Sequence, residues 1–227
     1  LHGERIEIDL NNMMMDFAES FVENMIDSDY EEFSFELIRQ AAVQPSFGEE
    51  EFEELKKHRG DLLDKVIEDI QNGYARRAEL AAKTAKPIID KVYAEQGSQY
   101  ENIYIPLTDG RLGFNVPVDL KKCAASDCTE IYKMFSKIVM LTTIDDAWRE
   151  HLREMDELRH SVQNASYEQK DPLVIYKFES FDLFRKMHEK VYVDTLSTLN
   201  KGYIPTRNAS DEEMKQQPQM TKTHIMK

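Results

Sequence analysis

The sequence predicts a mainly α-helical protein made of long amphipathic helices, with one antiparallel pair of helices and one small β-hairpin. Apolar residues recur every three or four positions over most of the 227 residues, which is the spacing of one helix face. The spacing changes to the strict alternation of a strand around residues 103–118. A short polar loop before Asp171 separates the two longest helical stretches, so these helices are expected to run antiparallel.

The first 60 residues are expected to contain two helices. Apolar residues at helical spacing predict an amphipathic helix over residues 6–26. In the acidic stretch that follows, Ser46 and Glu49 have the spacing of a capping box, which predicts a short helix over residues 47–58. Residues 1–60 contain 5 basic and 16 acidic residues, a net charge of −11. A solvated acidic face is favoured there over a site for a basic partner.

The next stretch predicts a long helix followed by a hairpin. Residues 61–96 keep the helical spacing, and Pro87 is expected to break or kink this run because proline lacks an amide hydrogen. Asp109 and Gly110 tolerate positive φ and lie between two alternating stretches, which predicts a β-hairpin. Each strand contains a proline that would confine it to an edge or bulge position, so a small satellite hairpin is expected and not the core of a sheet.

The two longest helices are predicted over residues 130–163 and 172–200. Asp127 and Glu130 form a second candidate capping box in front of the first helix. The apolar stripe of the first helix consists of Phe135, Ile138, Leu141, Ile144, Trp148, Leu152, Met155, Leu158 and Val162, and that of the second of Val174, Phe178, Phe181, Phe184, Met187 and Val191.

The second long helix has clear signals at both ends. Asp171 is the expected N-cap, and Pro172 occupies the first helical position, where its missing amide hydrogen costs nothing. Gly202 is expected to end the helix as the residue just beyond its last turn. Residues 203–227 are polar and have no periodicity, so they are expected to form a flexible tail.

Composition excludes several classes of function. The chain has 29 basic and 43 acidic residues, and its net charge of −14 argues against binding nucleic acid. The absence of a long apolar run and a mean hydropathy of −0.60 argue against a transmembrane helix, and two cysteines in so long a chain favour the reducing cytosol. No glycine spacing fits a phosphate loop, so the chain is not expected to bind or hydrolyse ATP. The sequence begins with Leu1, inside a stretch that already has helical spacing, so this chain is expected to be a fragment of a longer protein.

No constellation of residues predicts an active site or a metal site. Cys123 and Cys128 supply two thiols where a structural zinc needs four ligands, so two ordinary reduced thiols are favoured. Trp148 lies on the apolar stripe and is expected to be a core or domain-contact residue. Tyr167 lies in the polar loop without an apolar neighbour at helical spacing, which suggests a contact outside the helix pair.

Four stretches of this sequence closely resemble the C-terminal part of the SecA family, the motors of bacterial preprotein secretion. The matching stretches are Ile144–Leu152, Met155–Arg159, Tyr167–Pro172 and Tyr176–Phe181. The resemblance implies a helical scaffold with its first segment at residues 1–27 and a two-helix finger at residues 129–202. It also implies a helical wing at residues 28–128.

The resemblance further implies the roles of particular residues at the tip of the finger. In that family the finger reaches into the SecY channel complex, and a bulky residue at its tip contacts the unfolded preprotein. Tyr167 matches that position, and Gln169 and Lys170 adjoin it. Lys170 is expected to meet channel carboxylates or anionic headgroups of the membrane surface.

At the base of the finger, the resemblance implies a regulatory contact with the ATPase domains of the motor through Trp148, Arg149 and His151. ATP and magnesium would be bound by those domains, which this sequence does not include, and no cofactor or metal is expected in this chain. A cytoplasmic location with peripheral association to the inner membrane is implied. The alternative is a free-standing helical interaction module that binds a basic partner through its acidic wing.

Overall fold

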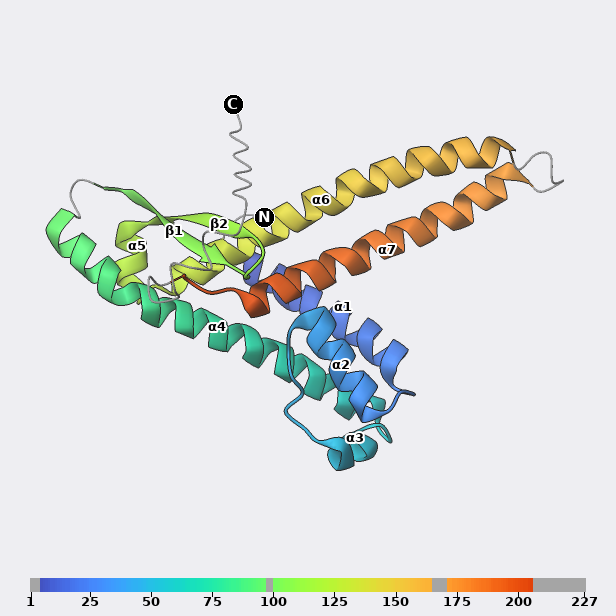
Figure 1. Ribbon diagram of the computed structural model, residues 1–227, viewed down its shortest axis with the longest axis horizontal. Coiled ribbons are helices and arrows are strands. Elements are labelled where there is room, and N and C mark those ends of the chain that lie inside the picture. The colour runs from blue at the N-terminus through green and yellow to red at the C-terminus, as the bar shows by residue number, and fades with distance from the viewer. Residues whose placement is uncertain (1–4, 97–99, 165–170, 206–227) are drawn as a thin grey trace.

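The computed structural model describes residues 5–96, 100–164 and 171–205. Within these ranges the chain forms seven helices and one two-stranded antiparallel sheet, which confirms the predicted mainly α-helical class (Figure 1). The elements in chain order are α1 (Ile6–Met25), α2 (Tyr30–Ala41), α3 (Glu49–Leu55), α4 (Arg59–Gln96), β1 (Asn102–Thr108), β2 (Gly113–Asp119), α5 (Leu120–Ala125), α6 (Thr129–Asn164) and α7 (Pro172–Lys201).

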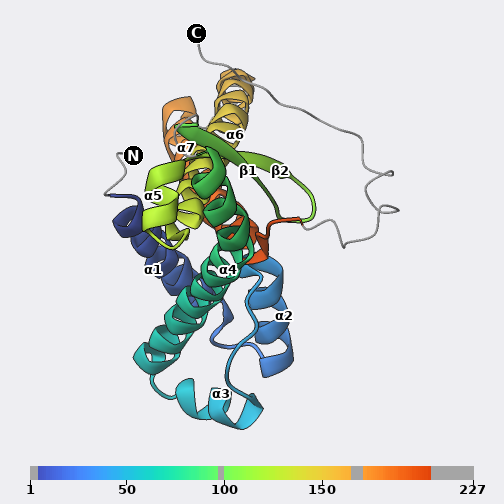
Figure 2. The same cartoon turned by 90° about the vertical axis from the view of Figure 1, so that its left-hand side faces the viewer.

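Helix α1 forms where helical spacing predicts it and buries one face against α4, α6 and α7. Figure 2 shows α1 and α2 on either side of α4. The N-cap residue is Arg5, and its side chain makes no capping hydrogen bond. The helix is therefore stabilised mainly by burial of its apolar face. The buried face consists of Ile6, Leu10, Met13, Met14, Phe17, Ala18, Phe21 and Val22.

The acidic stretch that follows contains two helices, of which the sequence predicted one. Helix α2 begins after Asp29, whose carboxylate accepts a hydrogen bond from the Glu32 amide at 2.8 Å. The predicted capping box of α3 is wrong, because the N-cap is Gly48 and no side chain caps it. The amide of Ser46 instead donates to Asp69 at 2.9 Å, so the bounds of 47–58 shorten to those of α3.

Aromatic side chains hold this acidic part of the chain together from inside. Phe33 of α2 lies 4.7 Å from Phe52 of α3, centroid to centroid, and 5.1 Å from Phe21 of α1. Phe33 and Phe52 are fully buried. Three helices with outward-facing carboxylates therefore share one apolar centre, which explains how a stretch with such high charge folds.

Helix α4 continues through Pro87, so the predicted break does not occur, while a kink at this residue stays a prediction. Proline removes one backbone hydrogen bond from the preceding turn, which weakens a helix unless other contacts hold it. Ala85 and Ile89 on either side are buried, and Lys86 forms an ion pair with Asp127 at 2.5 Å. Packing of this part of α4 against α5 and α6 offsets the lost hydrogen bond.

The hairpin forms as predicted, with Gly110 at φ +88° in its turn. Thr108 exchanges two backbone hydrogen bonds of 2.9 Å with Tyr203, so Thr108 faces the outer edge of β1. By alternation Pro106 also faces that edge, and Pro117 faces the outer edge of β2, so neither proline interrupts the ladder. The inner face packs into the main core through Ile105, Leu107, Val116 and Val118.

The joint between α5 and α6 differs from the prediction. Asp127 does not cap α6, because its backbone is left-handed with φ at 50° and its carboxylate pairs with Lys86. Instead Asp127 belongs to the turn that ends α5, and Cys128 follows it with φ at 67°. Helix α6 then begins at Thr129, whose hydroxyl donates to the Ser126 carbonyl at 3.0 Å.

Helices α6 and α7 pack antiparallel and extend away from the other elements (Figure 1). Asp171 caps α7 by accepting a hydrogen bond from the Leu173 amide at 2.9 Å, and Pro172 takes the first helical position, both as predicted. Gly202 follows the last turn of α7, but with φ at −57° it is not left-handed. It is a glycine because an added Cβ would lie 2.6 Å from a ring carbon of Phe135 and 2.7 Å from the hydroxyl oxygen of Tyr132.

The end of α7 is fastened to the core by hydrogen bonds. The hydroxyl of Tyr132 in α6 donates to the Leu199 carbonyl. The side-chain amide of Asn200 donates to the Ala41 carbonyl at 2.9 Å, and Arg77 of α4 donates to the Asn200 carbonyl at 2.8 Å. These bonds tie α7 to α2, α4 and α6 at one point.

Candidate functional site

The feature that most distinguishes this fold is its projecting pair of helices. We call α6 and α7 the finger, and residues 144–164 and 171–188 its outer half. Figure 1 shows no other labelled element beside most of the outer half. Its two helices therefore depend on each other for packing, and much of their surface is open to solvent.

A narrow seam joins the two finger helices. Near the base, the hydroxyls of Thr143 and Thr195 lie 2.7 Å apart and share a hydrogen bond between α6 and α7. Within the described part of the outer half, α7 has half-buried side chains but no fully buried one, since its buried residues begin at Val191. The seam on α6 consists of Ala147, His151, Leu158 and Val162.

Trp148 lies on the surface of the finger and not in its core. Its side chain is 48% exposed, and Ile144 and Leu152 are exposed to a similar degree. The predicted core position is therefore wrong, while a contact with another domain stays a prediction. The physical reason is that α6 is apolar on two adjacent faces, and only the face with Ala147 and His151 turns toward α7.

His151 is the buried member of the three residues assigned to the finger base. It is 7% exposed, and its Nδ1 atom has no hydrogen-bond partner. Its ring centroid lies 5.6 Å from that of Trp148 and 6.0 Å from that of Phe184 in α7. His151 therefore connects the exposed face of α6 to α7.

The ring contacts continue across α7 to α1. Phe184 lies 4.8 Å from His188, and His188 lies 5.6 Å from Tyr192, centroid to centroid. The Tyr192 hydroxyl donates to Asp16 of α1 at 3.0 Å. Burial, together with this hydrogen bond and the negative charge of Asp16, raises the pKa of Tyr192 to about 12. An unbroken row of contacts thus runs from Trp148 to α1.

Arg149 is exposed and pairs with Asp146 on the same helix at 3.0 Å. An exposed pair of this kind contributes little to stability, so the guanidinium is available to other partners at small cost. Arg149 does not join the row of rings, although it neighbours Trp148 in sequence. The structure therefore brings together Trp148 and His151 and leaves Arg149 on the surface.

The three residues assigned to the finger tip, Tyr167, Gln169 and Lys170, lie outside the described residues. Their assignment rests on the family resemblance. The described helices lead up to this segment from both sides, with α6 ending at Asn164 and α7 beginning at Pro172.

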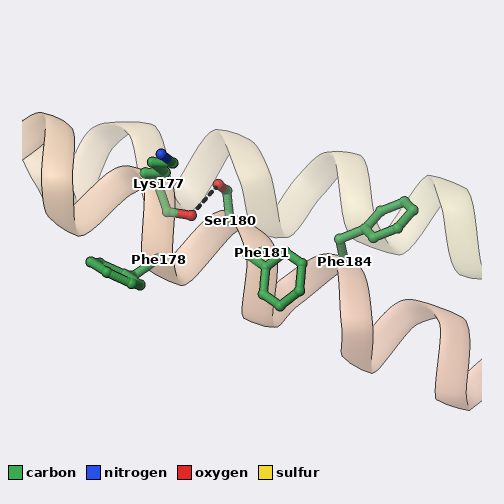
Figure 3. Close-up of a pocket in the computed structure, with 5 residues that line it drawn as sticks. All are labelled: Lys177, Phe178, Ser180, Phe181 and Phe184. Carbon is green, nitrogen blue, oxygen red and sulfur yellow. Dashed lines mark hydrogen bonds between the residues drawn. The ribbon is translucent and has the colours of Figure 1, made fainter.

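A second apolar surface lies on α7 and was missed by the sequence reasoning. Phe178 and Phe181 are 69% and 67% exposed, and they line a shallow hollow with Lys177, Ser180 and Phe184 (Figure 3). The Ser180 hydroxyl donates to the Lys177 carbonyl at 3.1 Å. The signal was present, because these residues belong to the predicted stripe of α7, but a stripe does not reveal whether it faces a partner helix or solvent.

A metal site and a membrane span each require particular residues. Nowhere in residues 5–96, 100–164 and 171–205 do three or more His, Cys, Asp or Glu side chains form a group able to hold a metal ion. In the same ranges, none of the helices has the length and apolarity needed to cross a membrane. The finger is a projecting pair of helices with exposed apolar side chains on both α6 and α7.

The fold and its surfaces define a helical scaffold protein with a projecting two-helix finger. Comparison with known sequences agrees with this class and identifies the family. The family model described as the SecA Wing and Scaffold domain matches residues 1–202, and the chain belongs to this family. The resemblance seen in the sequence is thereby confirmed.

Curated relatives carry the name "Protein translocase subunit SecA". The chain is 44% identical over 216 residues to the protein from Parabacteroides distasonis and 45% identical over 213 residues to that from Bacteroides fragilis. It is 39% identical over 226 residues to the protein from Porphyromonas gingivalis. These alignments cover 95%, 94% and 99% of this chain, but only about a fifth of each relative, 19%, 19% and 20%. The chain therefore corresponds to the wing and scaffold region of these proteins.

Proposed function

We propose that this chain is part of a full-length SecA motor that pushes preproteins through the SecY channel. Within that motor it is the non-catalytic scaffold and finger, which contacts the channel and the preprotein and regulates the ATPase. The observation that carries the proposal is the finger: a long helix pair fastened at its base and exposed along its outer half. In this proposal ATP and magnesium act in other domains of the motor, and this chain converts their movement into displacement of the finger tip.

The base of the finger has the construction that a lever needs. Hydrogen bonds donated by Asn200, Arg77 and Tyr132 fix α7 to three other helices. Close-packed helices transmit displacement with little loss, because a well-packed core resists compression. Rotation at the base is then passed to the tip, where Tyr167 grips unfolded chains by apolar contact that does not depend on their sequence.

The part of the outer half that adjoins the base also offers a surface for regulation. In the proposal, the exposed face with Trp148 and Arg149 contacts the ATPase domains and restrains them until channel and preprotein are engaged. Support comes from the exposed indole, since a large aromatic with about half of its surface in water has area left to bury against another domain. His151 links this face to α7, and so to the remainder of the finger.

The remaining assignments are part of the same proposal. The boundaries at residues 27 and 128 divide scaffold from wing, and residues 203–227 form the tail. The partners are the SecY channel complex, the unfolded preprotein, the ATPase domains of the motor and, peripherally, the inner membrane surface, with no nucleic acid. The location is cytoplasmic and membrane-associated. Membership of the family favours this function over a free-standing module that binds a basic partner.

Stiffness of the finger is the first point to test. In full-length SecA containing this chain, a double substitution Glu157→Gly and Glu179→Gly softens both helices at exposed positions, because glycine costs about 1 kcal/mol per site in a helix. The matched control is Glu157→Ala with Glu179→Ala, which removes the same charges and keeps the helices. We expect the glycine variant to hydrolyse ATP but to import less preprotein into vesicles per ATP than the alanine variant. Equal import by the two variants would contradict the lever.

The grip of the tip is tested separately. Tyr167→Phe removes one hydroxyl and is expected to keep ATP-driven import, whereas Tyr167→Gly is expected to abolish most of it without lowering the unfolding temperature. If Tyr167→Gly imports normally, the tip is not the gripping point. If it unfolds the finger, the ring is a packing residue.

A further inference from the structure

The two cysteines of this chain meet at the joint that leads into the finger. Cys123 lies in the last turn of α5, and Cys128 lies one residue before α6. Both are free thiols with exposed fractions of 0% and 1%. No other cysteine occurs in the sequence, and the function proposed above does not use either one.

The backbone of the joint brings the two side chains together. The Cys128 amide donates to the Cys123 carbonyl at 2.9 Å, which is the six-residue closure of a Schellman motif. In this motif a contact between the side chains of the two residues joined by that bond is frequent. Here both side chains are thiols, and each shifts the pKa of the other.

The same joint is strained. Asp127 and Cys128 are consecutive left-handed residues with φ at 50° and 67°, although glycine is the residue that adopts this conformation without cost. An exposed ion pair of 2.5 Å between Lys86 and Asp127 connects the outer side of the turn to α4. A strained turn held by an exposed ion pair is a place where local opening requires less free energy than global unfolding.

We propose that Cys123 and Cys128 form an oxidisable dithiol that closes to a disulfide across the joint between α5 and α6. The oxidant is a small disulfide. The Cys128 thiol loses its proton to solvent, and its thiolate attacks one sulfur of the oxidant. A mixed disulfide forms between Cys128 and that sulfur, and the other half of the oxidant leaves as a thiolate that takes up a proton. The Cys123 thiolate then attacks the Cys128 sulfur and displaces the second half of the oxidant, so two protein thiols become one disulfide and one small disulfide becomes two thiols.

Local opening controls the rate of this reaction. Burial raises the pKa of Cys123 to about 12 and also raises that of Cys128, so few thiolates exist while the joint is closed. We take Cys128 as the first nucleophile, because its neighbour Cys123 acts against this rise in its pKa. The disulfide then fixes residues 123–128, and with them the direction in which α6 leaves the core.

The experiment uses the full 227-residue chain and oxidised glutathione. Trypsin cleaves after Lys122 and Lys133, so both cysteines fall in one peptide, and a disulfide within it lowers its mass by about 2 Da. After quenching with acid and alkylation, we expect this peptide from the folded chain, at a rate independent of protein concentration. As a control, the chain unfolded in urea is treated in the same way, to show that oxidised glutathione can form the disulfide when both thiols are accessible. If the unfolded chain oxidises while the folded chain stays reduced, or only links between chains form, the dithiol proposal is overturned.

The role of the joint is tested with a matched pair of variants. Lys86→Met removes the ion pair over the joint and is expected to speed oxidation by about twofold to fivefold. Lys83→Met removes an exposed pair with Glu79 one turn away and should leave the rate unchanged. Measuring the oxidation rate in low concentrations of urea distinguishes local opening from global unfolding. The free energy of local opening depends weakly on denaturant, whereas that of global unfolding depends on it steeply. Equal rates in the two variants, or a rate that follows global unfolding, would refute opening at this joint.

Discussion

Gly202 gives the sharpest test of how the finger is fastened, through the substitution Gly202→Ala. Its backbone, with φ at −57° and ψ at 135°, is open to any residue, so alanine suffers no conformational strain there. The new methyl group would lie 2.6 Å from the Phe135 ring and 2.7 Å from the Tyr132 hydroxyl oxygen. Both rings are fully buried, so other side chains of the core surround them.

The expected cost follows from these contacts. Carbon atoms pack at about 3.5–4.0 Å, so the Phe135 ring or the backbone must move by about 1 Å. Overpacking of this kind costs about 1–3 kcal/mol, and strain on the hydrogen bond from Tyr132 to Leu199 adds up to about 1 kcal/mol. The smaller entropy of an unfolded chain with alanine offsets about 0.4–1 kcal/mol. We expect a net loss of about 2 kcal/mol.

The assay is urea unfolding of the full chain, followed by circular dichroism. The matched control is Gly60→Ala in the first turn of α4, where an added Cβ meets nothing within 4 Å. That change should stabilise the chain by up to about 1 kcal/mol, because alanine is the better helix former. A loss below about 0.5 kcal/mol for Gly202→Ala, with an unchanged slope, would show that the rings yield and that the reasoning from close packing is wrong.

Three further outcomes are expected. Trp148→Ala should cost about 1–2 kcal/mol in urea unfolding, since a half-exposed indole buries roughly 100 Å² and alanine favours the helix; a cost above about 3 kcal/mol would mean a core position. Folding raises the pKa of Tyr192 from 10.0 to about 12, so the stabilisation of the folded state by its protonated hydroxyl is present below pH 10 and is lost as the pH rises toward 12. Tyr192→Phe should therefore flatten the fall of the free energy of unfolding between pH 10 and 12, and an unchanged fall would contradict the hydrogen bond to Asp16. Asp171→Ala should weaken the first turn of α7 by about 1 kcal/mol, seen as faster amide exchange at Leu173, and unchanged exchange would contradict the cap.

The sequence predicted the elements whose signals are local. Asp171 and Pro172 mark the start of α7 without help from the rest of the chain, and Gly110 marks the hairpin turn, so these predictions are confirmed. Helix α2 was missed although Asp29 and Glu32 have the spacing of a capping box, because the charge of the stretch hid its few apolar anchors. Its fold depends on aromatic contacts with other helices, which spacing along the chain does not show.

The errors share one cause, which is competition from tertiary contacts. Pro87 does not end α4 because neighbouring residues are buried against α5 and α6. Asp127 has the sequence of a cap but pairs with Lys86, 41 residues away. Trp148 lies, with Ile144 and Leu152, on the part of its apolar stripe that points to solvent. For the candidate site, residue types and helix were predictable, but exposure was not, because two apolar faces on one helix look alike in sequence.

The bond between Asn200 and Ala41 has a consequence for how the chain acquires its structure. The two residues are 159 positions apart, and Tyr132 and Leu199 are 67 apart. Contacts between such distant residues slow folding, because a long loop must close before they form. During synthesis, α1 and α2 therefore leave the ribosome long before their partner α7 exists. The apolar faces of α1 and α2 therefore stay partly uncovered until α7 has been synthesised. During this interval the nascent chain is most exposed to aggregation and to capture by chaperones.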